Sequence, residues 1–268
     1  MIVACETVDI DGLRVGFRRA GRGAPLVLLH GIYGDSRNWA PQLEALSDEF
    51  MVVAWDAPGA GQSADPPESF GFAEYADCLA GLIRAVGLGR SHLCALSYSG
   101  AIVLELCRRH PDVLASLTLV GAYAGWAGSL PADKVTIRLE RALAQADLGG
   151  EAAAREFIPE LFAADAPSEL VEDAIALSSS FHPAGLRIMA RASADADLRE
   201  VQPQVAVPTL VMHGRGDRRS PLSVSEALHA GIPNSRLVVV DGAGHLTNME
   251  APEEFNRILR EFLRETSG

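Results

Sequence analysis

The sequence is poor in cysteine, and no two of its cysteines have the spacing of a metal site or redox motif. The four are Cys5, Cys78, Cys94 and Cys107, and no CxxC pair occurs among them. Structural zinc sites and thioredoxin-like motifs need such pairs. The spacing therefore predicts reduced thiols that pack in the interior, rather than disulfides or zinc ligands. The histidines also lack metal-site spacing.

Long apolar runs are absent as well. No run approaches the roughly 18 residues that a membrane-spanning helix needs. The opening MIVACETVDIDG lacks the basic and apolar regions of a secretion signal. We therefore expect a soluble cytoplasmic protein that does not associate with membranes.

Basic residues are outnumbered by acidic ones. The chain has 23 Lys and Arg against 35 Asp and Glu, so its formal charge is 23 − 35 = −12. No basic cluster could neutralise a row of phosphates, which disfavours nucleic acid and anionic membranes as partners. The expected partner is a small-molecule substrate. The sequence does not indicate an oligomeric state.

Short apolar runs recur along the 268 residues, and helical patterns lie between several of them. The runs are continuous rather than alternating, which is typical of parallel strands covered on both faces. They span residues 26–29, 51–54, 93–96, 117–120, 209–212 and 237–240. Apolar stripes with helical spacing occur at 102–107 and 255–262. The alternation predicts a doubly wound α/β sheet.

Two segments depart from this alternation. The start of the chain has two strand-like stretches about Asp11-Gly12, which predicts an edge hairpin. Residues 122–200 lose the strand runs, and prolines divide them into helical stretches such as AAAREFIPELF. We therefore predict a core domain of residues 1–121 and 201–268, with residues 122–200 as a helical insertion.

Ser97 directly follows the apolar run at 93–96. A serine on a sharp strand-to-helix turn can act as a nucleophile, provided small residues lie two positions before and after it. Ala95 and Ser99 occupy those positions, and Gly100 follows. Ser99 is the rival nucleophile, but its position relative to the apolar run and the helix favours Ser97. The alternative is that Ser97 only caps the helix.

Polar residues follow other strand runs in an order that suits a serine nucleophile. Asp217 follows the run at 209–212, and His245 follows the run at 237–240. Serine needs a base to take its proton, and the base needs a carboxylate to orient it. In the motif HGIYG, the backbone N–H of Ile32 is a candidate oxyanion donor, which could pair with the N–H of Tyr98 directly after Ser97. His30 is placed to brace this loop.

These motifs together resemble the α/β-hydrolase fold family. They are LVLLHGIYG (26–34), VVAWDAPGAGQS (52–63), CALSYSGA (94–101), VPTLVMHGRGD (207–217) and GAGHLTNMEAPEEF (242–255). The resemblance implies a mostly parallel doubly wound sheet with N-terminal antiparallel edge strands and a helical cap. It also implies Ser97, His245 and Asp217 as a triad, with Ile32 and Tyr98 as oxyanion donors.

The match departs from the family pattern where Ala95 and Ser99 replace glycines. The serine itself argues against the dehalogenase and epoxide hydrolase branches. No metal or organic cofactor is implied. The overall pattern is similar to esterases, enol-lactonases and cofactor-free haloperoxidases.

We therefore predict a serine hydrolase that cleaves a small, largely apolar carboxylic ester or lactone through an acyl-enzyme. Candidate pocket residues are Tyr33, Trp126, Phe181 and Met189, although the last three could equally be packing residues of the cap. One alternative is hydrolysis of a carbon–carbon bond in an anionic ring-cleavage product. It ranks lower because no cationic cluster is evident. The other alternative is a non-catalytic receptor that retains the pocket.

Overall fold

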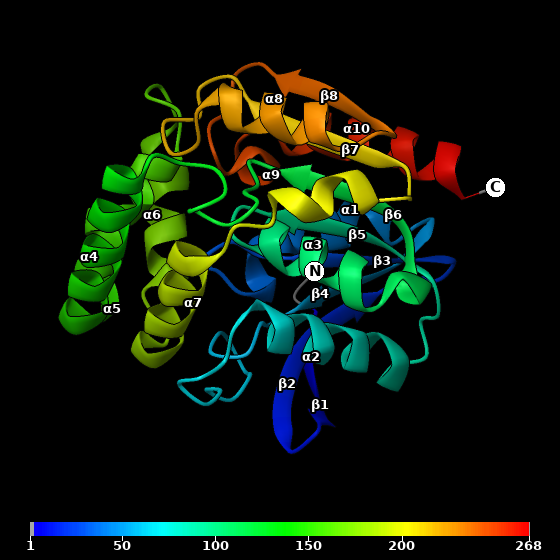
Figure 1. Cartoon of the computed structure of the whole chain (residues 1–268), viewed down its shortest axis with the longest axis horizontal. Helices are drawn as coiled ribbons and strands as arrows, with labels where there is room; N and C mark the ends of the chain where they lie inside the picture. The colour runs from blue at the N-terminus through cyan, green and yellow to red at the C-terminus, as the bar shows by residue number, and fades with distance from the viewer. Residues whose placement is uncertain (1–2, 268) are drawn as a thin grey trace.

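The computed structural model describes residues 3–267, and an eight-stranded sheet forms its centre (Figure 1). The strand order is β1-β2-β4-β3-β5-β6-β7-β8. Strand β2 pairs antiparallel with both β1 and β4, and the remaining neighbours pair in parallel. The strands are β1 Cys5–Ile10, β2 Leu13–Ala20, β3 Ala24–Leu29, β4 Phe50–Trp55, β5 Ser91–Leu96, β6 Leu114–Val120, β7 Thr209–Gly214 and β8 Ser235–Val240.

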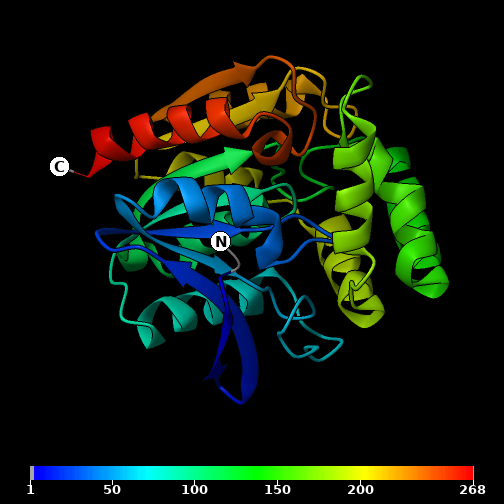
Figure 2. The same ribbon diagram turned by 180° about the vertical axis from the view of Figure 1, so that it is seen from behind.

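The sheet lies between two layers of helices. Helices α1 and α10 cover the face seen in Figure 2, and α2, α3 and α8 cover the face seen in Figure 1. The α-helices are α1 Ala40–Leu46, α2 Phe72–Ala85, α3 Ser99–Arg109, α4 Ala132–Leu148, α5 Gly150–Phe157, α6 Ser168–Ser178, α7 Pro183–Asp195, α8 Leu222–Gly231, α9 Thr247–Glu250 and α10 Pro252–Thr266. Short 3-10 helices span η1 Ser36–Trp39, η2 Pro111–Val113, η3 Ile158–Leu161 and η4 Arg199–Gln204.

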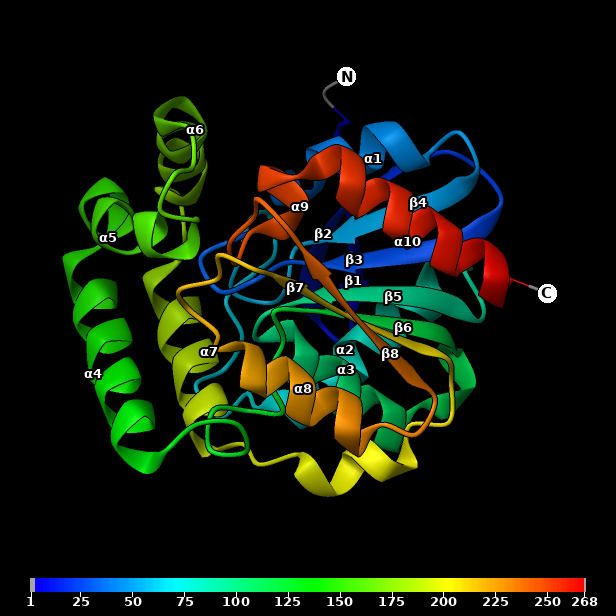
Figure 3. The same cartoon turned by 90° about the horizontal axis from the view of Figure 1, so that it is seen from above.

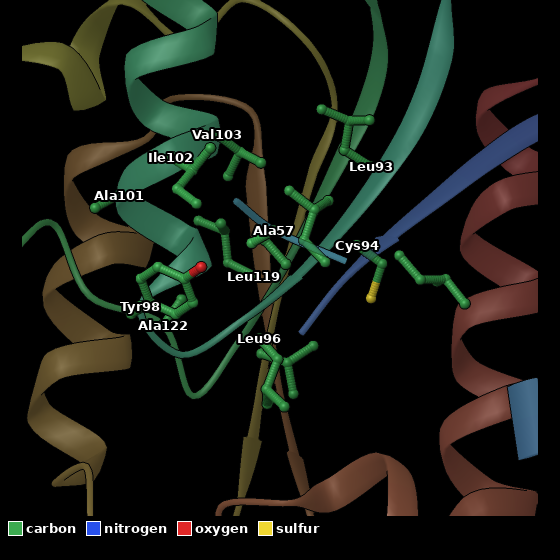
Figure 4. Close-up of a cluster of buried hydrophobic side chains, with 14 of the residues drawn as sticks. Ala57, Leu93, Cys94, Leu96, Tyr98, Ala101, Ile102, Val103, Leu119 and Ala122 are labelled. Carbon is green, nitrogen blue, oxygen red and sulfur yellow. The ribbon is translucent and has the colours of Figure 1, made fainter. Parts of the chain in front are cut away.

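The predicted strand runs and helical stripes are confirmed. All six apolar runs lie within β3 to β8, and the two stripes lie within α3 and α10. Ile102 and Val103 point from α3 toward the sheet, where Leu119 of β6 lies (Figure 4). All three side chains are fully buried. Covering both faces in this way explains why the runs are continuous rather than alternating.

The expected hairpin is present at one edge of the sheet. Strands β1 and β2 pair from Cys5 opposite Arg18 to Ile10 opposite Leu13. The connecting residues Asp11 and Gly12 have φ angles of +51° and +85°. Two consecutive positive φ angles match the right-handed twist of the strands, and Asp-Gly tolerates them.

Residues 122–200 contain helices α4 to α7 and no strand, and the structure describes all of them. In Figure 3 these helices stand together beside the sheet. Figure 2 shows that the β6 arrow, drawn in green, points toward them. The stretch AAAREFIPELF is not one continuous helix, because α5 ends at Phe157 and a 3-10 turn carries Pro159. Proline lacks an N–H and cannot continue an α-helix without loss of a hydrogen bond.

The four cysteines are free thiols, of which Cys78 and Cys94 are buried. Among the helices within residues 3–267, none combines the length and apolar character that a membrane crossing requires.

Helix α7 touches the core where two glycines meet. A Cβ on Gly185 would lie 2.0 Å from the carbonyl oxygen of Gly59. We predict that Gly185→Ala lowers the free energy of unfolding by about 1–3 kcal/mol, because α7 must move away from the core. Urea unfolding measures this. Arg191→Ala, at an exposed position of the same helix, is the control and should change stability by less than about 0.5 kcal/mol. An unchanged Gly185→Ala protein would contradict the close contact.

Candidate active site

Ser97 occupies a strained turn between β5 and α3. Its φ angle is +58°, in the left-handed region that residues other than glycine rarely adopt. Such a conformation costs about 1–3 kcal/mol and persists only where neighbouring contacts impose it. Here the Ser97 N–H donates to the carbonyl of Val120 at 2.9 Å, and the Ser97 carbonyl accepts from the N–H of Gly100 at 3.0 Å. The turn leaves Ser97 lining a cavity at the carboxyl end of the sheet.

The residues after Ser97 pack too closely for larger side chains. A Cβ on Gly100 would lie 2.6 Å from the Cβ of Ala122. The Ser99 hydroxyl is fully buried and donates to the carbonyl of His30 at 2.6 Å. Ser99, which the sequence offered as an alternative nucleophile, therefore holds the loop after β3. Ser97 lines the cavity instead.

The structure brings His245 and Asp217 together. His245 Nδ1 lies 2.7 Å from Asp217 Oδ2, and both side chains are almost completely buried. The other carboxylate oxygen, Oδ1, accepts from the N–H groups of Arg219 and Ser220 at 2.7 and 2.8 Å. His245 also lines the cavity that Ser97 lines.

These contacts determine the charge of Asp217 and the tautomer of His245. Burial alone would raise the pKa of Asp217, but His245 and the Ser220 N–H more than offset it, so the pKa lies below its ordinary value. An ionised carboxylate only accepts hydrogen bonds, so Nδ1 of a neutral His245 must carry the proton. Nε2 is then the nitrogen that can take a proton from elsewhere.

Two further residues position the histidine, and sequence reasoning missed both. A Cβ on Gly121 would lie 3.0 Å from His245 Nδ1 and would crowd the ring, and the φ angle of +50° there also favours glycine. Glu250 accepts from the N–H groups of Gly244 and Ala163, both at 2.9 Å, and so connects the His245 loop to residues 122–200. Burial raises the pKa of Glu250. In the sequence, a single glycine or glutamate with such a role looks the same as one in an ordinary turn or on the surface.

The loop after β3 approaches Ser97 closely. The position of a Cβ on Gly31 is 3.5 Å from the Ser97 Cβ. His30 braces this loop as expected, because its Nδ1 lies 2.8 Å from the Gly31 carbonyl and its Nε2 accepts from the Ala57 N–H at 3.0 Å. Ile32 and Tyr98 both line the cavity. Among residues 3–267, neither of their backbone N–H groups donates to a protein acceptor.

The cavity is small and mostly apolar. Its volume is about 10 Å³, roughly the space that one water molecule needs. Trp126, Phe157 and Leu161 contribute from residues 122–200, and Leu96 and Leu246 contribute from the core.

Of the other expected pocket residues, Tyr33 lines an adjoining cavity. Phe181 packs on the Tyr33 ring at 4.8 Å between centroids. Met189 is buried and does not line either of these two cavities.

Arg219 also lines the cavity, although the sequence offered no sign of it. It lies two residues beyond Asp217, where DRRS reads as a polar turn. Within residues 3–267, no three His, Cys, Asp or Glu side chains come together as a metal site would require.

Comparisons with a family model and with known proteins indicate the same family. The model of the alpha/beta hydrolase fold family matches residues 24–252. A protein of Klebsiella pneumoniae named as a carbamate hydrolase, RutD, is 31% identical over 249 residues, which cover 90% of this chain and 92% of that protein.

Solved structures agree. A thermophilic esterase from Thermogutta terrifontis has a TM-score of 0.88 and 32% identity, with 99% of each chain covered. The enol-lactonase from Burkholderia xenovorans has a TM-score of 0.85 and 25% identity, and the match covers 97% of this chain and 100% of that one.

The left-handed turn predicts an unusual order of stability at position 97. Ser97→Gly relieves the steric cost of positive φ and Ser97→Ala does not, so the glycine variant should be more stable by about 0.5–1 kcal/mol. Urea unfolding of the two variants measures the difference. At Ser179, where φ is −64°, the order should reverse, because glycine there only adds freedom to the unfolded chain. The same order at both positions would contradict the strain.

The Asp217 contacts predict a pH-dependent contribution to stability. Because the folded-state pKa is lowered, the ionised carboxylate stabilises the fold above the unfolded pKa of about 3.9, and that contribution is lost as pH falls through the folded pKa. The difference in unfolding free energy between wild type and Asp217→Asn should therefore shrink toward pH 3 and be largest above about pH 5. Urea unfolding across this range checks it. A difference that grows on acidification would contradict the account.

Proposed function

The chain belongs to the alpha/beta hydrolase fold family, and from this premise we propose that it is a serine hydrolase of small, largely apolar carboxylic esters or lactones. Ser97 is the nucleophile, His245 the general base and acid, and Asp217 the residue that orients His245. The observation that carries the proposal is the buried 2.7 Å contact between His245 Nδ1 and Asp217 Oδ2, beside a cavity that Ser97 and His245 both line.

In the proposed reaction, Ser97 Oγ attacks the carbonyl carbon while its proton passes to His245 Nε2. Negative charge develops on the carbonyl oxygen and is stabilised by the unpaired N–H groups of Ile32 and Tyr98. His245 then protonates the leaving alcohol, and an ester to Ser97 remains. Water, deprotonated by His245, attacks this ester, releases the acid and restores the Ser97 hydroxyl.

The surroundings of the cavity support a small and largely apolar substrate. Leu96, Phe157 and Leu246 offer only hydrocarbon surface, and Trp126 adds a largely apolar ring. We propose residues 122–200 as a cap, because four residues of this segment, Tyr123, Trp126, Phe157 and Leu161, line the cavity. The closed cavity is too small for an ester, so the cap or its side chains must move for substrate to enter.

A carbamate is a second candidate substrate. The similarity to the Klebsiella protein named as a carbamate hydrolase favours it. A carbamate carbonyl could be attacked by the same serine and stabilised by the same two N–H groups, so the difference would lie in the leaving group and in the lining of the cavity.

The test is turnover of p-nitrophenyl acetate and butyrate. Ser97→Ala should lower kcat by at least about 10⁴-fold, because the nucleophile is lost. Asp217→Asn should lower it by about 10⁴-fold, because His245 then presents the wrong tautomer.

Ser99→Ala is the matched control. Its hydroxyl is engaged with His30, so this variant should remain much more active than Ser97→Ala. Equal turnover by Ser97→Ala and wild type would remove Ser97 from the mechanism. Absence of turnover in wild type as well, across esters, lactones and carbamates, would favour a receptor that retains the pocket.

A further inference from the structure

The Arg219 side chain lies against two aromatic rings beside the candidate active site. Its guanidinium carbon is 5.0 Å from the centroid of the Phe157 ring and 5.9 Å from that of Trp126. Arg219 lines the cavity of Ser97 and His245, and also the adjoining cavity. Both rings belong to residues 122–200, so the guanidinium sits where that segment meets the core.

No Asp or Glu in the described part of the chain forms an ion pair with this guanidinium. The nearby carboxylate of Glu160 instead pairs with Arg141 at 2.8 Å. Arg138 brings a second positive charge close to Arg219. Its side chain donates to the Tyr123 hydroxyl and to the backbone carbonyl of Arg219. The cation thus has aromatic faces around it but no anion.

Arg219 remains charged in spite of these surroundings. Burial, followed by the positive charge of Arg138, lowers its pKa to about 10, which leaves the group protonated at neutral pH. A half-buried cation without an anionic partner is costly, because the rings replace only part of the lost hydration and cannot use its N–H donors. A guanidinium in this situation, at the lining of a cavity, is suited to bind an anion.

The backbone of Arg219 is also fixed relative to the candidate triad. Its N–H donates to Asp217 Oδ1 at 2.7 Å, and its carbonyl accepts from Arg138. The two rings limit how far the side chain can move. The backbone from which the guanidinium extends is therefore fixed relative to Asp217 and so to His245, which favours a role in orienting substrate.

We infer that Arg219 determines specificity by binding a carboxylate on the substrate, so that the preferred substrate is a small anionic ester or lactone. The inference rests on the proposed function, because it concerns the same cavity. An anionic substrate is disfavoured by the sequence, where no cationic cluster is evident. The structure reverses that ranking, because the unpaired guanidinium of Arg219 lines both cavities, and Arg138 and Arg141 also line the adjoining one. The paired N–H donors of arginine match the two oxygens of a carboxylate.

The experiment compares four esters that differ in one charged group. Ethyl butyrate is neutral, monoethyl succinate carries the carboxylate on the acyl side, and O-butyryl glycolate carries it on the alcohol side. The ethyl ester of β-alanine is cationic and of similar length. Hydrolysis is followed by acid release in a pH-stat. The proteins are wild type, Arg219→Gln, Arg219→Lys and Arg215→Gln.

We expect wild type to prefer at least one anionic ester over ethyl butyrate in kcat/KM and to disfavour the cationic ester. In Arg219→Gln, the ratio of anionic to neutral kcat/KM should fall by about 30-fold or more, as loss of a desolvated charge pair implies. Arg219→Lys should keep part of the ratio, because it keeps the charge but loses the fork of donors. Arg215→Gln, which removes an exposed guanidinium from the same loop, should leave the ratio unchanged.

Two results would overturn the inference: no wild-type preference for either anionic ester, or a ratio that Arg219→Gln leaves unchanged. Either could occur with full Ser97-dependent turnover of ethyl butyrate, and the proposed function would then stand alone.

Calorimetric binding of the same anionic esters to Ser97→Ala separates recognition from chemistry. Binding that Arg219→Gln weakens by a similar factor supports the inference even if wild type turns over none of the esters. Binding that Arg219→Gln leaves unchanged overturns it.

Discussion

A buried hydrogen bond of 2.7 Å between His245 and Asp217 joins the loops that follow β8 and β7. It can form because the two strands pair in parallel and in register, so that both loops leave the same edge of the sheet. Gly121 leaves space beneath the imidazole, and Glu250 holds the preceding backbone. Without this contact the imidazole would lack a fixed tautomer and, in the proposed mechanism, could not serve as an oriented base for Ser97.

The sequence predicts most of the frame. Continuous apolar runs mark β3 to β8, and Asp11-Gly12 marks the hairpin, because strand burial and turn geometry restrict residue choice strongly. The positions of Ser97, Asp217 and His245 follow from the same logic, since each stands just beyond a strand end. Strand runs, turns and residues at strand ends all depend on neighbouring positions along the chain, and a single sequence shows those positions directly.

The lining of the cavity does not follow from the sequence in the same way. Arg219 faces the site only because Trp126 and Phe157, far away in the chain, fold over it. Met189 shares the apolar character of Trp126, yet it packs in the interior while Trp126 lines the cavity. Which of two apolar residues reaches a pocket depends on how residues 122–200 pack against the core. The periodicity of a sequence predicts which face of a helix is buried, but it does not predict which element packs against that face.

The account as a whole depends on Ser97 being the reactive hydroxyl in a cavity prepared for oxyanion chemistry. The most direct measurement is peptide mapping by mass spectrometry after reaction with a fluorophosphonate probe. The account predicts a phosphonate on Ser97 in wild type, and much slower modification when His245 is replaced by alanine. A phosphonate on Ser99, or modification of Ser97 at the same rate without the imidazole, would contradict it.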